Sequence, residues 1–123
     1  MNKSIRIGGA SGFWGDSYRA TEQLLQDTTL DFIVYDYLAE ITMSIMARAR
    51  AKSPSAGYAT DFIDAVIKPY IRRISTHNTR LISNAGGVNS EKCAEVISEL
   101  VKDLRLNLKV SCITGCLLYT SPS

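Results

Sequence analysis

The sequence has few of the residues that build metal sites, disulfide frameworks and nucleic-acid interfaces. Its 123 residues include one histidine and three cysteines. The odd number and wide spacing of Cys93, Cys112 and Cys116 argue against a disulfide framework and against a zinc site, so we predict no bound metal. The 14 basic and 12 acidic residues leave a net charge of only +2. We therefore expect no nucleic-acid partner, which would need a clearly basic domain.

Long apolar runs and a secretory leader are also lacking. No apolar run approaches the length of a membrane span, and Arg6 stands where a signal peptide needs its apolar core. We therefore expect a cytoplasmic protein with no membrane partner. Apolar residues still make up 46% of the chain, and a chain of this size is expected to form one domain with a real core.

Short apolar runs alternate with helical patterns along the chain. Apolar composition and turn signals predict strands at residues 4–8, 31–36, 80–83 and 107–113. Periodicity predicts helices at residues 16–26, 39–51, from Thr60 onward with a kink or restart at Pro69, and 89–105. This alternation predicts an α/β fold with a doubly wound, mostly parallel sheet and helical crossovers.

Two of these helices have a clear expected inner face. In the helix at residues 39–51, Ile41, Ile45 and Ala49 fall on one face and should point inward. The strongest periodic signal lies in the helix at residues 89–105, whose apolar stripe consists of Cys93, Ile97, Leu100, Val101 and Leu104.

Ligands of open parallel sheets bind beyond the carboxyl ends of the strands, and the first such loop here is rich in glycine. Gly9, Ser11, Gly12 and Asp16 belong to this loop. Its backbone N–H groups could bind a phosphate or a carboxylate, although Asp16 would repel an anion. The loop lacks the GxGxxG spacing and the lysine of a P-loop. A tight turn between strand and helix is the alternative interpretation.

Acidic residues follow the second strand and open the next helices. Asp36 and Glu40 could act as general acid and base or hold a cation. Alternatively, Asp36 caps the next helix, and Glu40 lies in its first turn. Asp61 could contact a ligand, or it could be a first-turn acid after a Thr60 cap.

The loop after the third strand resembles a second backbone cradle. It contains Asn84, Gly86, Gly87 and Asn89. The alternative is a tight turn at the two glycines, with Asn89 as the N-cap of the following helix. His77 is expected at a helix end, where a protonated imidazole suits the helix dipole. No Ser-His-Asp or Cys-His arrangement can be built around it.

Four blocks of the sequence resemble the acyclic terpene utilisation (AtuA-type) family. They are IRIGGASGFWGD (residues 5–16), DYLAEITMS (36–44), GYATDF (57–62) and NAGGVN (84–89). Members of that family are longer, so the resemblance implies that residues 1–115 form the N-terminal part of an acyclic terpene utilisation α/β domain. Residues 116–123 look like a non-native tail from sequencing-adapter read-through, and the alternative is an apolar tail packed on the sheet.

The resemblance also implies a function. Such a protein would belong to the bacterial breakdown of acyclic monoterpenoids such as citronellol and geraniol, whose acids are processed as CoA thioesters. We expect a small-molecule or acyl-CoA-like ligand, bound through an anionic group at the strand ends, while the cofactor stays unknown. The chain could be an enzyme or a non-catalytic partner subunit, and we expect the full-length form to be oligomeric.

Overall fold

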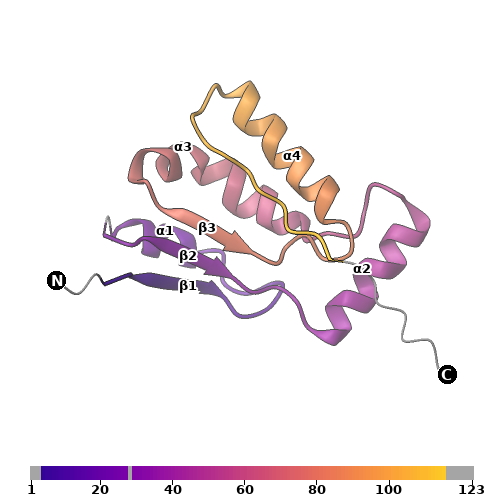
Figure 1. Ribbon diagram of the computed structural model, residues 1–123. Helices are drawn as coiled ribbons and strands as arrows, with labels where there is room; N and C mark the ends of the chain where they lie inside the picture. Colours follow the sequence, from indigo (N-terminus) through magenta and orange to yellow (C-terminus); the bar gives the residue numbers. More distant parts are fainter. Residues whose placement is uncertain (1–3, 28, 116–123) are drawn as a thin grey trace.

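Strands and helices alternate along the chain, as expected for an α/β protein. The computed structural model describes residues 4–27 and 29–115. The elements are β1 (Ile7–Ser11), α1 (Ala20–Leu25), β2 (Phe32–Tyr35), α2 (Glu40–Lys52), the π-helical segment η1 (Phe62–Ile67), α3 (Lys68–His77), β3 (Arg80–Ser83) and α4 (Ser90–Asp103) (Figure 1). In the described part of the chain, no helix is long and apolar enough to cross a membrane.

The strands form a parallel sheet in the order β1-β2-β3, which confirms the predicted α/β class. The predicted strand at residues 80–83 coincides with β3. The prediction for the first strand was wrong by three residues, because β1 begins at Ile7 and continues to Ser11. Its glycines do not end the strand, since Gly8 and Gly9 pair with β2. Gly8 also leaves room for Leu24, because a Cβ there would lie 2.9 Å from a Leu24 methyl group.

The core lies between the sheet and the helices that follow β1 and β2. Ile33 and Tyr35 of β2 are 0% and 2% exposed. In the helical segment that follows Thr60, Phe62, Val66 and Ile67 are buried as well. Pro69 lies at the start of α3, so the chain does restart there as predicted. The π-helical turn that precedes it was not predicted.

The opposite face of the sheet is largely open within the described residues. Ile7 of β1 and Ile82 of β3 lie on this face, and their side chains are 62% and 53% exposed. A second helix layer, which a doubly wound fold requires, therefore stays a prediction.

The expected inner face of α2 was wrong. Ile41 and Ile45 are 71% and 47% exposed, whereas Met46 is 1% exposed. The helix projects beyond the end of the sheet (Figure 1). Among the described residues, its buried side chain toward the rest of the molecule is Met46, and the two isoleucines stay largely exposed.

The predicted fourth strand does not form. Residues 107–113 have no strand structure and run back from α4 as extended chain (Figure 1). The alternating residues Leu106, Leu108 and Val110 pack against the core, but their backbone makes no ladder with β3. The predicted stripe of α4 is confirmed, because Cys93 and Val101 are buried and the others pack against the core. The predicted tail at residues 116–123 lies outside the described residues.

Candidate functional site

The three strands end side by side, which brings separate loops to one edge of the sheet. The N–H of Asp36 donates to the carbonyl oxygen of Ser11 at 3.1 Å. The Asn84 side chain donates from Nδ2 to Oδ1 of Asp36 at 2.7 Å, and its own Oδ1 accepts the N–H of Tyr37 at 2.8 Å. Three of the predicted site residues, Ser11, Asp36 and Asn84, are therefore neighbours, whereas their role in binding stays a prediction.

The glycine loop after β1 is closed by its own acidic residue. One carboxylate oxygen of Asp16 accepts the N–H of Gly12 at 2.9 Å, and the other accepts the N–H of Ser17 at 2.7 Å. These two hydrogen bonds hold the pKa of Asp16 below its usual value. An anion could use the Gly12 amide only by displacing Asp16. Because Asp16 and Ser17 serve the loop, α1 begins at Ala20, later than predicted.

Asp61 ties the glycine loop to the helical segment that follows Thr60. Its Oδ2 accepts hydrogen bonds from Nε1 of Trp14 at 3.0 Å and from the hydroxyl of Tyr18 at 3.2 Å. The charge of Asp61 and this hydrogen bond raise the pKa of Tyr18. The expected Thr60 cap is absent, since Thr60 already lies within the helical turn. Asp61 therefore binds two aromatic donors from another loop.

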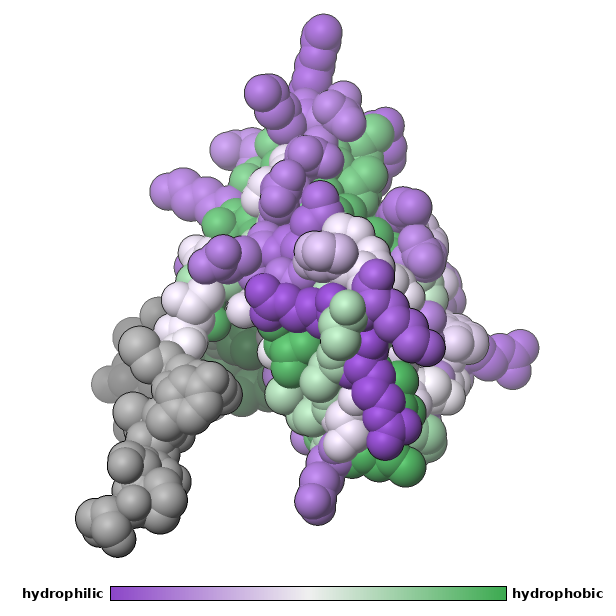
Figure 2. All heavy atoms as spheres, turned by 90° about the vertical axis from the view of Figure 1, so that its right-hand side faces the viewer, coloured by the Kyte–Doolittle hydropathy of each residue, from purple (hydrophilic) through white to green (hydrophobic). Residues whose placement is uncertain are grey.

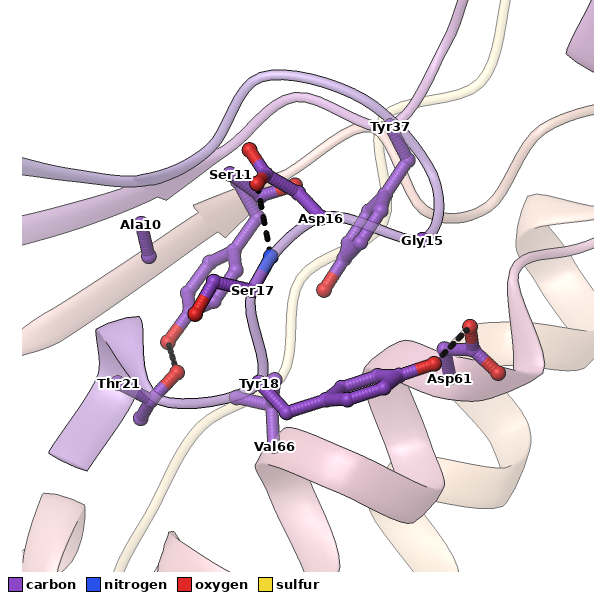
Figure 3. A pocket seen from close by; sticks show the side chains of 11 residues that line it. Ala10, Ser11, Gly15, Asp16, Ser17, Tyr18, Thr21, Tyr37, Asp61 and Val66 are labelled. Atoms are coloured by element: carbon purple, nitrogen blue, oxygen red, sulfur yellow. Dashed lines mark hydrogen bonds between the residues drawn. The ribbon is translucent and has the colours of Figure 1, made fainter.

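A small pocket lies between the glycine loop, the end of β2 and η1 (Figure 3). Its volume is about 10 Å³, which is about the space that one water molecule needs. Ser11, Asp16, Tyr18 and Asp61 line it together with Tyr37. The Tyr37 side chain is 5% exposed, and its hydroxyl group points into the pocket (Figure 3). The pocket therefore combines a water-sized volume with several polar side chains.

A larger hollow of about 380 Å³ lies on the other side of Trp14. It is lined by Trp14, by residues of α2 and by the loop after α2, including Ile45, Met46, Ala49, Tyr58 and Thr60. Its volume falls within the range of small-molecule pockets. Trp14 lines the larger hollow and donates to Asp61, which lines the smaller pocket, so this hydrogen bond links the walls of the two spaces.

The loop that contains Asn84 and Asn89 packs against the loop after α2. Nδ2 of Asn89 donates to the carbonyl oxygens of Pro54 and Ala56 at 3.1 and 2.8 Å. Asn89 occupies the N-cap position of α4, as predicted, but its side chain makes no capping hydrogen bond there. Its amide instead holds the two loops together.

Gly86 and Gly87 are required by close packing in this loop. A Cβ at Gly86 would lie 2.7 Å from the Cα of Ser90. Gly87 has a φ of +55°, and a Cβ there would lie 2.7 Å from the carbonyl oxygen of Gly57. These contacts explain both glycines structurally, while the binding role predicted for them has no test here.

The comparison with protein families covers nearly the whole chain. The family model "Acyclic terpene utilisation family protein AtuA" matches residues 5–121. The chain belongs to the AtuA family. No curated protein and no solved structure matches it.

The paired carboxylates predicted in this AtuA-family chain lie on consecutive elements. Asp36 directly follows β2 and is held by Asn84, whereas Glu40 begins α2, and both residues are exposed. The predicted helix cap by Asp36 was wrong, because Ala39 occupies the N-cap and its N–H donates to Oγ1 of Thr42 at 2.6 Å. Both acidic side chains thus remain accessible at the edge of the sheet.

Two tyrosines that line the small pocket were not predicted as site residues. Tyr35 and Tyr37 stand two residues apart around the end of β2, and both side chains are buried. Side chains two residues apart along a strand lie on the same face of the sheet, so the spacing of these two tyrosines could have indicated that they share a site. The contact between Tyr18 and Asp61, 43 residues apart, had no such signal.

Metal-binding residues do not gather in this AtuA-family chain as far as the structure describes it. No group of three or more histidine, cysteine, aspartate or glutamate side chains could hold an ion among those residues. His77 is the last residue of α3, as predicted for a helix end, and its Nδ1 lies 2.6 Å from the carbonyl oxygen of Arg73.

Proposed function

We propose that this AtuA-family chain serves the cytoplasmic catabolism of acyclic terpenes in bacteria and binds an acyl or CoA-type terpenoid ligand at the carboxyl edge of its sheet. The observation that carries this proposal is the convergence of Ser11, Asp36 and Asn84 at the carboxyl edge of the sheet, where Ser11 also lines the smaller hollow. Open parallel sheets bind their ligands at this edge.

The two hollows suit the two ends of such a ligand. The larger one, at about 380 Å³, has mostly apolar walls and would take the branched hydrocarbon chain. The smaller one, lined by Asp61 and by hydroxyl-bearing residues that include Ser11, Tyr18 and Tyr37, would take its polar end. Asp36 and Glu40 are the candidates for general acid and base, since both are accessible next to this edge.

The experiment is a titration of the chain with geranoyl-CoA and with geranic acid, followed by thermal shift. Binding should raise the melting temperature by the amount that mass action predicts from the ligand concentration and Kd. Ala49→Trp should abolish this shift, because Ala49 lines the larger hollow and a large side chain would fill it. The absence of any shift in the unmodified chain at millimolar ligand would contradict the proposal.

The carboxylates are tested separately. Asp36→Asn and Glu40→Gln should abolish turnover or ligand binding while the melting temperature stays within a few degrees. Glu99→Gln on α4 is the control, because this exposed carboxylate lies on a helix that lines neither hollow. Unfolding of both variants would indicate a structural role instead.

A role as a partner subunit is the second candidate, and exposed apolar side chains favour it. Ile41 and Ile45 stand one helical turn apart on α2, and Ile82 is exposed on the open face of the sheet. Hydrophobic side chains also reach the surface between hydrophilic ones on the side of the molecule that carries α2 (Figure 2). A stoichiometric complex that the double variant Ile41→Glu/Ile45→Glu no longer forms would support this role.

A further inference from the structure

The Tyr37 side chain is almost fully buried, and its hydroxyl makes no hydrogen bond to the described residues. Its ring is fixed by neighbours, since it stacks on Tyr35 at 6.1 Å between centroids and meets the edge of Phe62 at 5.9 Å. Only 5% of the residue is exposed, and the hydroxyl points into the small pocket (Figure 3). No buried side-chain nitrogen or oxygen of the described residues lacks a hydrogen-bond partner, so this hydroxyl reaches the open space of the pocket, where an atom from outside the chain can accept its hydrogen bond.

The hydroxyl is held in the form that donates a hydrogen bond. Burial raises the pKa of Tyr37 well above its ordinary value, and the nearby Tyr35, Asp61 and Tyr18 raise it further. Tyr37 therefore remains protonated at neutral pH, and its hydroxyl can donate a hydrogen bond to an acceptor in the pocket.

The pocket disfavours an anionic acceptor. Two carboxylates, Asp16 and Asp61, line it, and no lysine or arginine does so. A third negative charge in this small space would be repelled by both carboxylates. The volume of about 10 Å³ admits only one atom-sized group. The acceptor that fits is therefore a single neutral oxygen atom.

We propose that Tyr37 is the hydrogen-bond donor for a neutral oxygen of the terpenoid ligand, either an alcohol hydroxyl or an aldehyde or thioester carbonyl, and that this subsite rejects a free carboxylate. The proposal rests on the proposed function, because it places the polar end of the same ligand. It narrows that function by excluding the free acid from the small pocket.

The test compares geraniol, geranial and geranic acid by calorimetric titration of the unmodified chain and of Tyr37→Phe. Geraniol and geranial should bind, and geranic acid should bind at least tenfold more weakly. Tyr37→Phe should weaken the binding of the two neutral ligands about three- to tenfold, which is the loss of one neutral hydrogen bond. Its effect on geranic acid should be small.

The melting temperature separates a binding role from a structural one. Tyr37→Phe removes a hydroxyl without a partner and should not lower the melting temperature. Tyr35→Phe removes a hydroxyl that lies 2.7 Å from Oγ1 of Thr21 and should lower it. Tyr70→Phe, on α3 and outside both hollows, is the binding control and should leave all three affinities unchanged.

Three outcomes would overturn the proposal. Equal binding of geraniol by the unmodified chain and Tyr37→Phe would exclude Tyr37 as the donor. Tighter binding of geranic acid than of geraniol would exclude the preference for a neutral oxygen, yet it would leave the proposed function intact. If none of these ligands nor geranoyl-CoA binds the unmodified chain, both the proposed function and this subsite fail.

Discussion

Asn84 holds Asp36 across the ends of β3 and β2, with 2.7 Å between Nδ2 of the amide and Oδ1 of the carboxylate. The same side chain accepts the N–H of Tyr37, which is the residue that places its hydroxyl in the small pocket. Asn84 therefore sets the path of the chain as it leaves the sheet.

Asn84→Ala should lower the free energy of unfolding by about 1–3 kcal/mol, because it leaves the Tyr37 N–H without its acceptor and removes the partner of Asp36. Urea denaturation measures this change. Asn84→Asp is the matched variant, since it keeps an acceptor for Tyr37 but places a second carboxylate beside Asp36. Its stability relative to the unmodified chain should recover as the pH falls and one of the two carboxylates takes up a proton. An alanine variant as stable as the unmodified chain would contradict this role.

Gly87→Ala should destabilise the chain by more than about 1 kcal/mol. The backbone has a φ of +55°, and the added Cβ would lie 2.7 Å from the carbonyl oxygen of Gly57. Gly9→Ala is the control, because a Cβ at this β1 position meets nothing within 4 Å. It should leave stability unchanged or raise it by about 0.4–1 kcal/mol through the unfolded state. Equal effects of the two substitutions in denaturant titrations would argue against the close approach of the two loops at Gly87.

The sequence predicted the elements whose signals are local. The strand at β3, the stripe of α4 and the restart at Pro69 depend on neighbouring residues, and the structure agrees with them. The strand expected at residues 107–113 failed, because alternating apolar residues can pack on a core without pairing their backbone. The inward face expected for Ile41 and Ile45 failed because periodicity does not say whether a helix lies over the sheet or beyond its end.

Some contacts of the candidate site could likewise be predicted from the sequence, and others could not. The convergence of Ser11, Asp36 and Asn84 could be predicted, since parallel strands end at one edge of the sheet. The pairing of Asp61 with Trp14 and Tyr18 could not, because contacts over 47 and 43 residues depend on the tertiary fold. The closure of the glycine loop by Asp16 could not be predicted either. An Asp in this position can repel an anion, or its own carboxylate can accept the hydrogen bond that the anion would accept, as it does from Gly12.

The glycine loop should loosen in acid. The pKa of Asp16 is lowered from 3.8 by hydrogen bonds from the N–H groups of Gly12 and Ser17. A lowered pKa in the folded state stabilises the fold above the unfolded value, and this contribution is lost as the pH falls through the lowered pKa. Asp16→Asn should therefore be less stable than the unmodified chain at neutral pH, and the difference should shrink below about pH 4. Thermal melts of the two chains across pH 2 to 7 measure the difference, and a gap that does not depend on pH would contradict this role of Asp16.

Trp14 is the one tryptophan of the sequence, so its fluorescence reports on the contact with Asp61. Asp61→Ala removes the acceptor of both the Trp14 and the Tyr18 hydrogen bonds, which releases the glycine loop from the helical segment. The indole should become more hydrated, and its emission should move to longer wavelengths without global unfolding. Asp64→Ala is the matched control, because Asp64 lies on η1 but pairs with Lys68 at 3.2 Å at the surface and touches neither aromatic donor. An emission shift of equal size in both variants would contradict a specific contact between Asp61 and Trp14, because Asp64 makes no such contact.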